Sequence, residues 1–350
     1  MLRDKWLRLP VERKKAMSDT EDLEKITSIY STLYPYQKEK LLSDLENCMI
    51  LNNASRSYCI KVCPKCGSKT PNWTRGGRAN SGKQMLVCHS CNHRIVVDYG
   101  QLTYYSQQDR SKWDQLIKDT FQQVPIQKSA ESLGISTYTV WRMRMKLLHA
   151  LEAIANETVV SDEVEMDEKY LLNSHKGEKR EDIKPRHRGE KASKRGLSSE
   201  QVCLLTAVQR QGDAVLKATN MAAPKSEDIE KIQKNLSGNC LVWIDGKTAY
   251  QRILNQKNCE FRVLGDHKTY TSVDHLNNVN SFHSRIDEWN RGYRGVATKY
   301  INRYAALLVT VRKYAGLAAD EVLLKVRTML SNVTDFFRIC DMKTSDLFAY

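Results

Sequence analysis

Long apolar runs are missing from this sequence. No stretch approaches the roughly 20 consecutive apolar residues that a helix needs to cross a bilayer. The N-terminal MLRDKWLRLP also lacks the apolar core of a secretory signal. We therefore expect no contact with a membrane and a location in the cytoplasm.

Acidic residues are in the minority. The chain has 55 Lys and Arg against 41 Asp and Glu among its 350 residues, and a formal net charge of +14. The excess is concentrated, because residues 51–100 contain 8 basic residues and 1 acidic residue, whereas residues 151–200 contain 10 and 12. Clustered Lys and Arg displace counterions from nucleic acids. This distribution favours a localised DNA-binding surface over a uniformly basic protein.

Paired cysteines stand out from isolated ones. Six of the ten cysteines are scattered, which suits a reducing compartment. The other four form two CxxC pairs, Cys63–Cys66 and Cys88–Cys91, separated by 21 residues. Two such pairs can close a tetrahedral thiolate site for Zn²⁺, with His89, His93 and Cys59 as alternative ligands.

The segment between the two pairs is typical of a hairpin rather than of a packed core. It would form a zinc ribbon with basic side chains along it, and we expect these to contact DNA phosphates. They are Arg75, Arg78, Lys83 and Arg94.

Residues 126–148 have the pattern of a helix-turn-helix. Gly134 suits the turn and Ser136 suits the N-cap of the second helix. The expected buried positions are Ala130, Leu133, Val140, Met143 and Leu147. The side chains expected to face a major groove are Thr137, Tyr138, Arg142 and Arg144. A generic pair of helices has the same pattern, but its position beside a basic ribbon favours DNA binding.

Two strand patterns deliver carboxylates to one edge of a sheet. From Val159 onward apolar and acidic residues alternate, which places Glu163, Glu165 and Asp167 on one face. The apolar run that begins at Leu241 ends abruptly at Asp245, followed by glycine. Because ligands of open α/β sheets bind at the carboxyl ends of the strands, we expect Asp167 and Asp245 to form one metal site.

The order of the remaining elements predicts a mixed α/β sheet. Further strands are expected at Gln201–Gln209, Ala214–Ala218 and Glu260–Leu264, with a helix near Ser226–Lys234. The basic stretch at 174–196 is too polar to pack, so it is expected to be a loop.

A helix within residues 273–308 supplies the third member of the site. Asn280, His283 or Ser284, and Asp287 recur at helical spacing and therefore share one face. Asn280 follows Asp245 by 35 residues.

With these residues in view, the chain resembles the DDE-superfamily insertion-sequence transposases, and within them the ISXO-two-like group. The most specific segments are VEMDEKY, RGEKASKRGLSSEQVCLL, WIDGKTAY, HLNNVNSFHS and RGVATKYINRY. The resemblance implies an RNase H-like catalytic domain that binds Mg²⁺ or Mn²⁺ through Asp167, Asp245 and Asn280. Asn280 stands where many relatives carry Glu.

The resemblance leaves alternatives at the site. Asp287 stands where relatives often carry a DNA-contacting Lys, although Arg285 is close and Lys299 is a further expected DNA contact. Asp287 or Glu288 is a rival third metal ligand. Auxiliary roles are open for Glu168, His275 and His283, each of which also has a purely structural interpretation.

The resemblance further implies double-stranded DNA partners, namely the terminal inverted repeats of an element and its target, bound by at least a homodimer in the nucleoid of a prokaryote. The expected domains are a helical leader at 1–57, the ribbon at 58–100, the helix-turn-helix domain at 101–156, the catalytic domain at 157–310 and a C-terminal helical segment at 311–350. Two other functions remain open: a DNA-binding regulator or decayed transposase without catalysis, and a simple metal-dependent nuclease.

Overall fold

The computed structural model describes residues 28, 31–34, 37, 60, 62–104, 106–178, 181, 190, 192–265 and 270–331. The chain divides into two compact units, Met1–Tyr58 and Cys59–Tyr350. Most of the expected helical leader and residues 332–350 lie outside the described residues. No helix among the described residues has the length and apolar character needed to span a bilayer.

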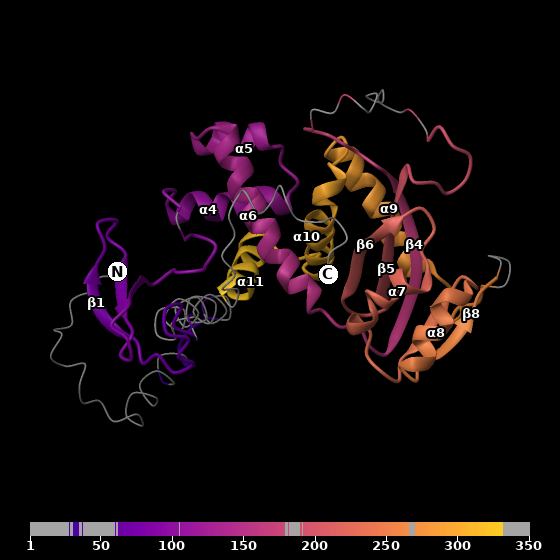
Figure 1. Cartoon of the computed structure of the whole chain (residues 1–350), viewed down its shortest axis with the longest axis horizontal. Helices are drawn as coiled ribbons and strands as arrows, with labels where there is room; N and C mark the ends of the chain where they lie inside the picture. The colour runs from indigo at the N-terminus through magenta and orange to yellow at the C-terminus, as the bar shows by residue number, and fades with distance from the viewer. Residues whose placement is uncertain are drawn as a thin grey trace. The chain divides into compact units, whose positions relative to one another are not determined.

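The expected hairpin is present as part of a three-stranded antiparallel sheet (Figure 1). Strand β1 (Thr74–Arg78) pairs with β2 (Gln84–Val87), which pairs with β3 (Arg94–Val96). The two CxxC segments flank the β1–β2 hairpin, so the sheet brings them to the same end of the ribbon.

Three helices follow: α4 (Arg110–Phe121), α5 (Ile126–Leu133) and α6 (Thr137–Asn156). Gly134 ends α5 in the left-handed conformation, with φ 62°, and the Ser136 side chain accepts a hydrogen bond from the backbone N–H of Thr139 to cap α6. These are the turn and cap that the sequence predicts. The expected inward residues are buried: Ala130, Leu133, Val140, Met143 and Leu147.

Arg144 corrects the sequence-based prediction, because it does not face a groove. Its side chain is buried, with 0% of its surface exposed. One guanidinium nitrogen donates to the Val124 carbonyl at 2.9 Å and lies 3.4 Å from Ser129 Oγ. Arg144 therefore ties α6 to the segment that leads into α5. The other three expected groove residues, Thr137, Tyr138 and Arg142, are exposed.

A five-stranded mixed sheet forms the second half of the unit, in the order β6-β5-β4-β7-β8. Its strands are β4 (Glu163–Leu172), β5 (Gln201–Gln209), β6 (Ala214–Met221), β7 (Leu241–Ile244) and β8 (Glu260–Val263). The β6-β5-β4 half is antiparallel, whereas β4-β7-β8 is parallel. A mixed sheet of this order, covered by helices, fits an RNase H-like transposase domain.

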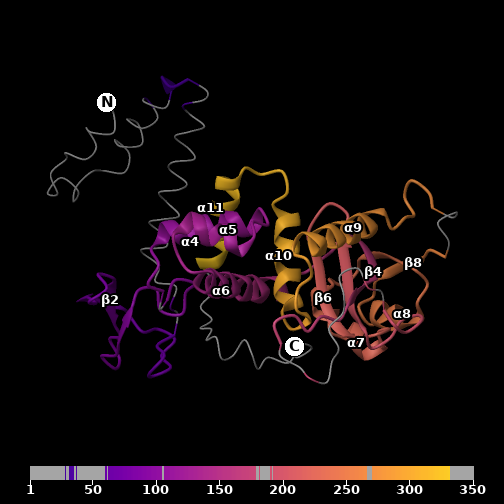
Figure 2. The same cartoon turned by 90° about the horizontal axis from the view of Figure 1, so that it is seen from above.

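Helices cover both faces of the sheet (Figure 2). Helix α7 (Ser226–Glu230) and α8 (Thr248–Gln256) pack on one face around Val164, Met166 and Val242. Helix α9 (Asn277–Gly292) and α10 (Ile301–Lys313) cover the other face, around Trp243 and Phe282. Burial of these two apolar layers fixes which face of β4 each side chain occupies.

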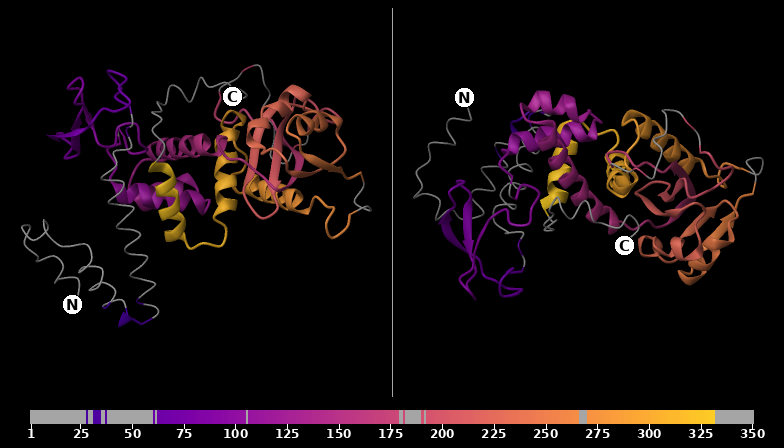
Figure 3. Two further views of the ribbon diagram at one scale, coloured as in Figure 1. Left: turned by 90° about the horizontal axis from the view of Figure 1, so that it is seen from below. Right: turned by 45° about the horizontal axis from the view of Figure 1, so that its top comes forward.

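Helix α6 continues this packing, since Leu147, Leu148 and Leu151 belong to the same apolar cluster as α10. The two helices contact and cross each other, α6 in magenta and α10 in gold (Figure 3). Helix α11 (Ala319–Ser331) lies within the expected C-terminal helical segment. Its Arg327 Nε donates to Asp114 Oδ1 of α4 at 2.7 Å.

The burial of Arg144 generates a stability prediction. Arg144→Ala should lower the free energy of unfolding by about 2–4 kcal/mol. The substitution opens a cavity, and it leaves the Val124 carbonyl and Ser129 Oγ without the hydrogen bonds that Arg144 donates. The exposed neighbour Arg142→Ala should change the free energy of unfolding by less than about 0.5 kcal/mol. Urea denaturation followed by circular dichroism measures both, and equal effects would contradict the structural role of Arg144.

Candidate functional site

Strand β4 places Asp167 on the face covered by α9. Its odd-numbered residues, including Glu165, Asp167 and Lys169, alternate with Val164 and Met166, which enter the apolar layer on the opposite face. Asp167 is directly opposite Thr206 of β5. This is the alternation that the sequence predicts.

The parallel pairing of β4 with β7 brings the second carboxylate beside the first. Glu165 pairs with Trp243, so continuing the register by two residues places Asp245 next to Asp167 at the carboxyl end of β7. Gly246 then turns the chain away with φ 90°, a conformation that favours glycine. Carboxylate oxygens of Asp167, Glu168 and Asp245 all lie within 4.8 Å of one another.

The electrostatics of this acidic cluster, Asp167, Glu168 and Asp245, favour a bound cation. Burial, and then repulsion by Asp245, raise the pKa of Asp167 to about 6. Asp245 Oδ1 is buried and has no hydrogen-bond partner among the described residues. Paired carboxylates with a free oxygen are a donor set that suits a hard divalent ion such as Mg²⁺ or Mn²⁺.

Lys247 is a member of the site that sequence reasoning missed. Its ammonium group contacts Glu168 Oε2 and lies 3.7 Å from Asp245 Oδ2. Burial lowers the pKa of Lys247. Its position two residues after Asp245 could have indicated this role, because the turn at Gly246 brings the Lys247 side chain back toward the end of β7.

Helix α9 runs beside β4 with its polar face toward the acids. His283 Nδ1 lies 3.7 Å from Asp167 Oδ2, and its Nε2 lies 3.0 Å from Thr206 Oγ1. Burial lowers the pKa of His283 to about 4, so the imidazole is neutral at pH 7. One turn further on, Asp287 Oδ2 accepts from Lys169 Nζ at 2.6 Å.

Asn280 and its two rivals occupy different environments. Asn280 is half-buried on the face of α9 that also carries His283 and Asp287, one turn nearer the helix N-terminus. Asp287 is engaged by Lys169, and Glu288 is exposed. Of the three, Asn280 is the one that is neither held in an ion pair nor turned to solvent.

Three further residues are the auxiliary candidate His275 and the expected DNA contacts Lys299 and Arg285. His275 Nδ1 lies 3.2 Å from Glu165 Oε1 rather than beside Asp167. Lys299 Nζ forms an ion pair with Glu178 at 3.1 Å, whereas Arg285 is exposed on α9.

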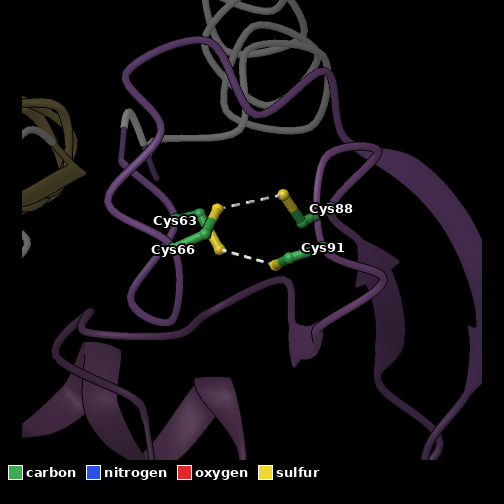
Figure 4. A group of neighbouring side chains, drawn as sticks. All are labelled: Cys63, Cys66, Cys88 and Cys91. Atoms are coloured by element: carbon green, nitrogen blue, oxygen red, sulfur yellow. Dashed lines mark hydrogen bonds between the residues drawn. The ribbon is translucent and has the colours of Figure 1, made fainter.

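The four paired cysteines form a second candidate metal site (Figure 4). Cys63 Sγ lies 3.6 Å from Cys91 Sγ, and Cys66 Sγ lies 3.9 Å from Cys88 Sγ. Tetrahedral coordination with metal–sulfur bonds of about 2.3 Å requires sulfur atoms about 3.8 Å apart, so the geometry fits. Each pair is followed by a left-handed residue, Gly67 or Asn92.

The basic side chains of the ribbon differ in accessibility. Arg75, Arg78 and Arg94 are exposed. Lys83 is half-buried and binds the Asp98 carboxylate and the Thr103 carbonyl, so it already has partners within the fold.

The raised pKa of Asp167 predicts a pH-dependent stability. Without divalent metal, ionised Asp167 opposes folding above about pH 6, and the penalty fades as the pH falls toward 4. Asp167→Asn should therefore raise the free energy of unfolding by about 1–3 kcal/mol at pH 7.5 and leave it unchanged near pH 4. Urea denaturation without added Mg²⁺ or Mn²⁺ measures this.

The exposed-pair variant Asp213→Asn is the control, because Asp213 pairs with Lys313 at the surface. It should show no such gain. An Asp167→Asn protein no more stable than wild type at pH 7.5 would contradict the repulsion between Asp167 and Asp245.

A search of curated proteins found no match. Among solved structures, the chain is similar to one described as a crystal structure of a pre-cleavage Mos1 transpososome, with 10% sequence identity and a TM-score of 0.20. That match covers 64% of this chain and 80% of the other.

A family model, the ISXO2-like transposase domain, matches residues 159–309. This range contains the whole mixed sheet, the acidic cluster and helix α9. Residues 159–309 are therefore similar to the ISXO2-like transposase domain.

Proposed function

We propose that this protein is a transposase that binds the ends of its insertion sequence and catalyses metal-dependent DNA cleavage and strand transfer. The observation that carries the proposal is the placement of Asp167 beside Asp245 at the carboxyl end of β7, with α9 alongside. The arrangement lies inside the family domain.

Asp167 and Asp245 would supply carboxylate oxygens to Mg²⁺ or Mn²⁺, and Asn280 would supply its amide oxygen. A divalent ion held by these residues would supply stabilisation of the attacking and leaving oxygens in an in-line phosphoryl displacement. Neutral His283, whose Nδ1 lies 3.7 Å from Asp167 Oδ2, adds no positive charge that would compete with a cation. Lys247 adds a positive charge at the rim of the cluster, where it can meet a DNA phosphate.

The proposed chemistry consists of two successive displacements at phosphorus. Water first attacks the phosphodiester at the end of the element, which frees a 3′-hydroxyl. That hydroxyl then attacks a phosphodiester of the target, so one bond is broken as another forms. No covalent bond between protein and DNA is required.

DNA recognition is assigned to the two preceding domains, the ribbon at 58–100 and the helix-turn-helix at 101–156. Arg75, Arg78 and Arg94 would contact phosphates. Thr137, Tyr138 and Arg142 would face the major groove from the first turns of α6. Because a transposase joins two ends, we further propose at least a dimer on paired-end DNA. A monomer in light scattering of that complex would refute this.

Two other functions are alternatives to this proposal. A DNA-binding regulator or decayed transposase needs no acidic cluster, so the buried Asp245 oxygen without a hydrogen-bond partner disfavours it. A simple nuclease would use the same acids but cleave without joining.

Mobility of a marked DNA segment carrying the flanks of the gene tests the proposal in cells. Wild type should give new insertions, Asp245→Ala should reduce them to background, and Asn280→Ala should reduce them about 10- to 100-fold, because a ligand to metal is lost. Asp213→Ala removes a surface carboxylate and should leave the frequency unchanged.

The same assay separates the alternatives. Wild-type activity in Asn280→Ala together with its loss in Asp287→Ala or Glu288→Ala would move the third ligand along α9. Cleavage without insertion would favour the nuclease. Insertions that persist in Asp245→Ala would contradict the role of Asp245 as a catalytic metal ligand.

The cysteine cluster is proposed to hold one structural Zn²⁺. Elemental analysis should find about one zinc per chain in wild type and almost none in Cys66→Ser/Cys88→Ser. That variant should also bind DNA more weakly, because the ribbon loses its fold. Cys203→Ser, a change at an isolated buried thiol, is the control. A full zinc content in the double variant would contradict the assignment.

A further inference from the structure

We propose that a buried trio, Glu165, Arg210 and Trp243, sets the relative positions of the three elements that carry the proposed metal ligands. The inference rests on the proposed function and deepens it. Glu165 lies on β4 and Trp243 on β7, each two residues before an acid of the cluster, and Glu165 also binds the start of α9.

Glu165 anchors the start of α9. Its side chain is fully buried, and one carboxylate oxygen accepts the backbone N–H groups of Asn278 and Val279 at 2.8 and 3.0 Å. Its other oxygen accepts from the Asn278 side-chain amide at 2.8 Å. A carboxylate at the N-terminus of a helix satisfies otherwise free donors and complements the helix dipole.

Arg210 joins the anchor to β7. Its Nε donates to Glu165 Oε1 at 3.0 Å, and a terminal nitrogen donates to the His275 carbonyl just before α9 at 3.1 Å. The guanidinium lies over the Trp243 ring, 3.6 Å from its centroid. Arg210 thus contacts β4, β7 and the segment that leads into α9.

Trp243 closes the network from its other edge. Its indole N–H donates to Asp274 Oδ1 at 2.9 Å, and the same oxygen accepts from Arg262 at 2.7 Å. The loop leading into α9 is therefore held to β7 on one side and to β8 on the other.

The register of these contacts points to positioning. Glu165 precedes Asp167 by two residues, Trp243 precedes Asp245 by two, and Asn278 precedes Asn280 by two. On a strand, residues two apart share a face, so Glu165 and Trp243 fix the strand segments whose next same-face residues are the acids. On α9, fixing the first turn determines where Asn280 lies.

A role in bulk stability alone is a weak explanation for such a cluster. Burying an ion pair costs desolvation that its attraction barely offsets, and apolar replacements are often as stable. Residues that hold metal ligands in place, by contrast, commonly affect metal affinity when altered. The trio is suited to the second role, because Glu165 and Trp243 each precede a proposed ligand by two residues, and Glu165 binds Asn278, which precedes the third.

Mn²⁺ binding to the full-length protein tests the inference. Electron paramagnetic resonance of free Mn²⁺ gives the affinity at pH 7.5 for wild type, Glu165→Gln and Arg210→Lys. Both variants keep side chains of similar size. Glu165→Gln removes the negative charge at the N-terminus of α9. Arg210→Lys removes the planar guanidinium group, with its paired donors and its stacking on Trp243. We expect each to weaken Mn²⁺ binding about 10- to 100-fold.

The matched control is Glu152→Gln, which removes the charge of a half-buried carboxylate that pairs with the buried Arg303 at 3.5 Å, outside the acidic cluster. It should leave the Mn²⁺ affinity at the wild-type value. Arg210→Lys carries the test if Glu165→Gln fails to fold.

The outcomes separate this inference from the proposed function. Wild-type Mn²⁺ affinity in a folded Glu165→Gln or Arg210→Lys protein would overturn the positioning role. An equal loss of affinity in Glu152→Gln would also overturn it, by reducing the effect to stability. Equal binding by wild type and Asp245→Ala would overturn the proposed metal site itself, and the inference with it.

Discussion

The structure depends on a close pair of like charges. The parallel alignment of β4 with β7 sets Asp167 beside Asp245, and burial together with mutual repulsion raises the pKa of Asp167 to about 6. Two ionised carboxylates at this separation oppose folding unless a cation lies between them. The surrounding residues are arranged to hold this unfavourable pair in place.

Support for the acidic pair comes from three directions. From the strand end, Lys247 supplies positive charge that partly offsets the repulsion. On the helix side, His283 contacts Asp167 in its neutral form. From below, Glu165 and Arg210 fix the helix and strand that approach the pair. The site is therefore held by contacts between segments far apart in the sequence. Asp167 lies on β4, and Asp245 directly follows the adjacent strand β7.

Features that depend on residues close together in the sequence could be predicted from it. Alternation placed Asp167 on its face, a sharp end to an apolar run placed Asp245, and Gly134 with Ser136 located the turn and cap of α6. Arg144 was assigned by its charge, although it follows Val140 by four residues and so shares the buried face. The role of Glu165 could not be predicted, because its partners lie 45 and 113 residues away.

Diffraction from crystals of the protein soaked in Mn²⁺ tests the central claim most directly, because anomalous scattering locates the ions and identifies their ligands. The account predicts Mn²⁺ bound to carboxylate oxygens of Asp167 and Asp245, with the Asn280 amide oxygen in one coordination sphere. An ion held instead by Glu168 or Asp287, with Asn280 turned away, would contradict it.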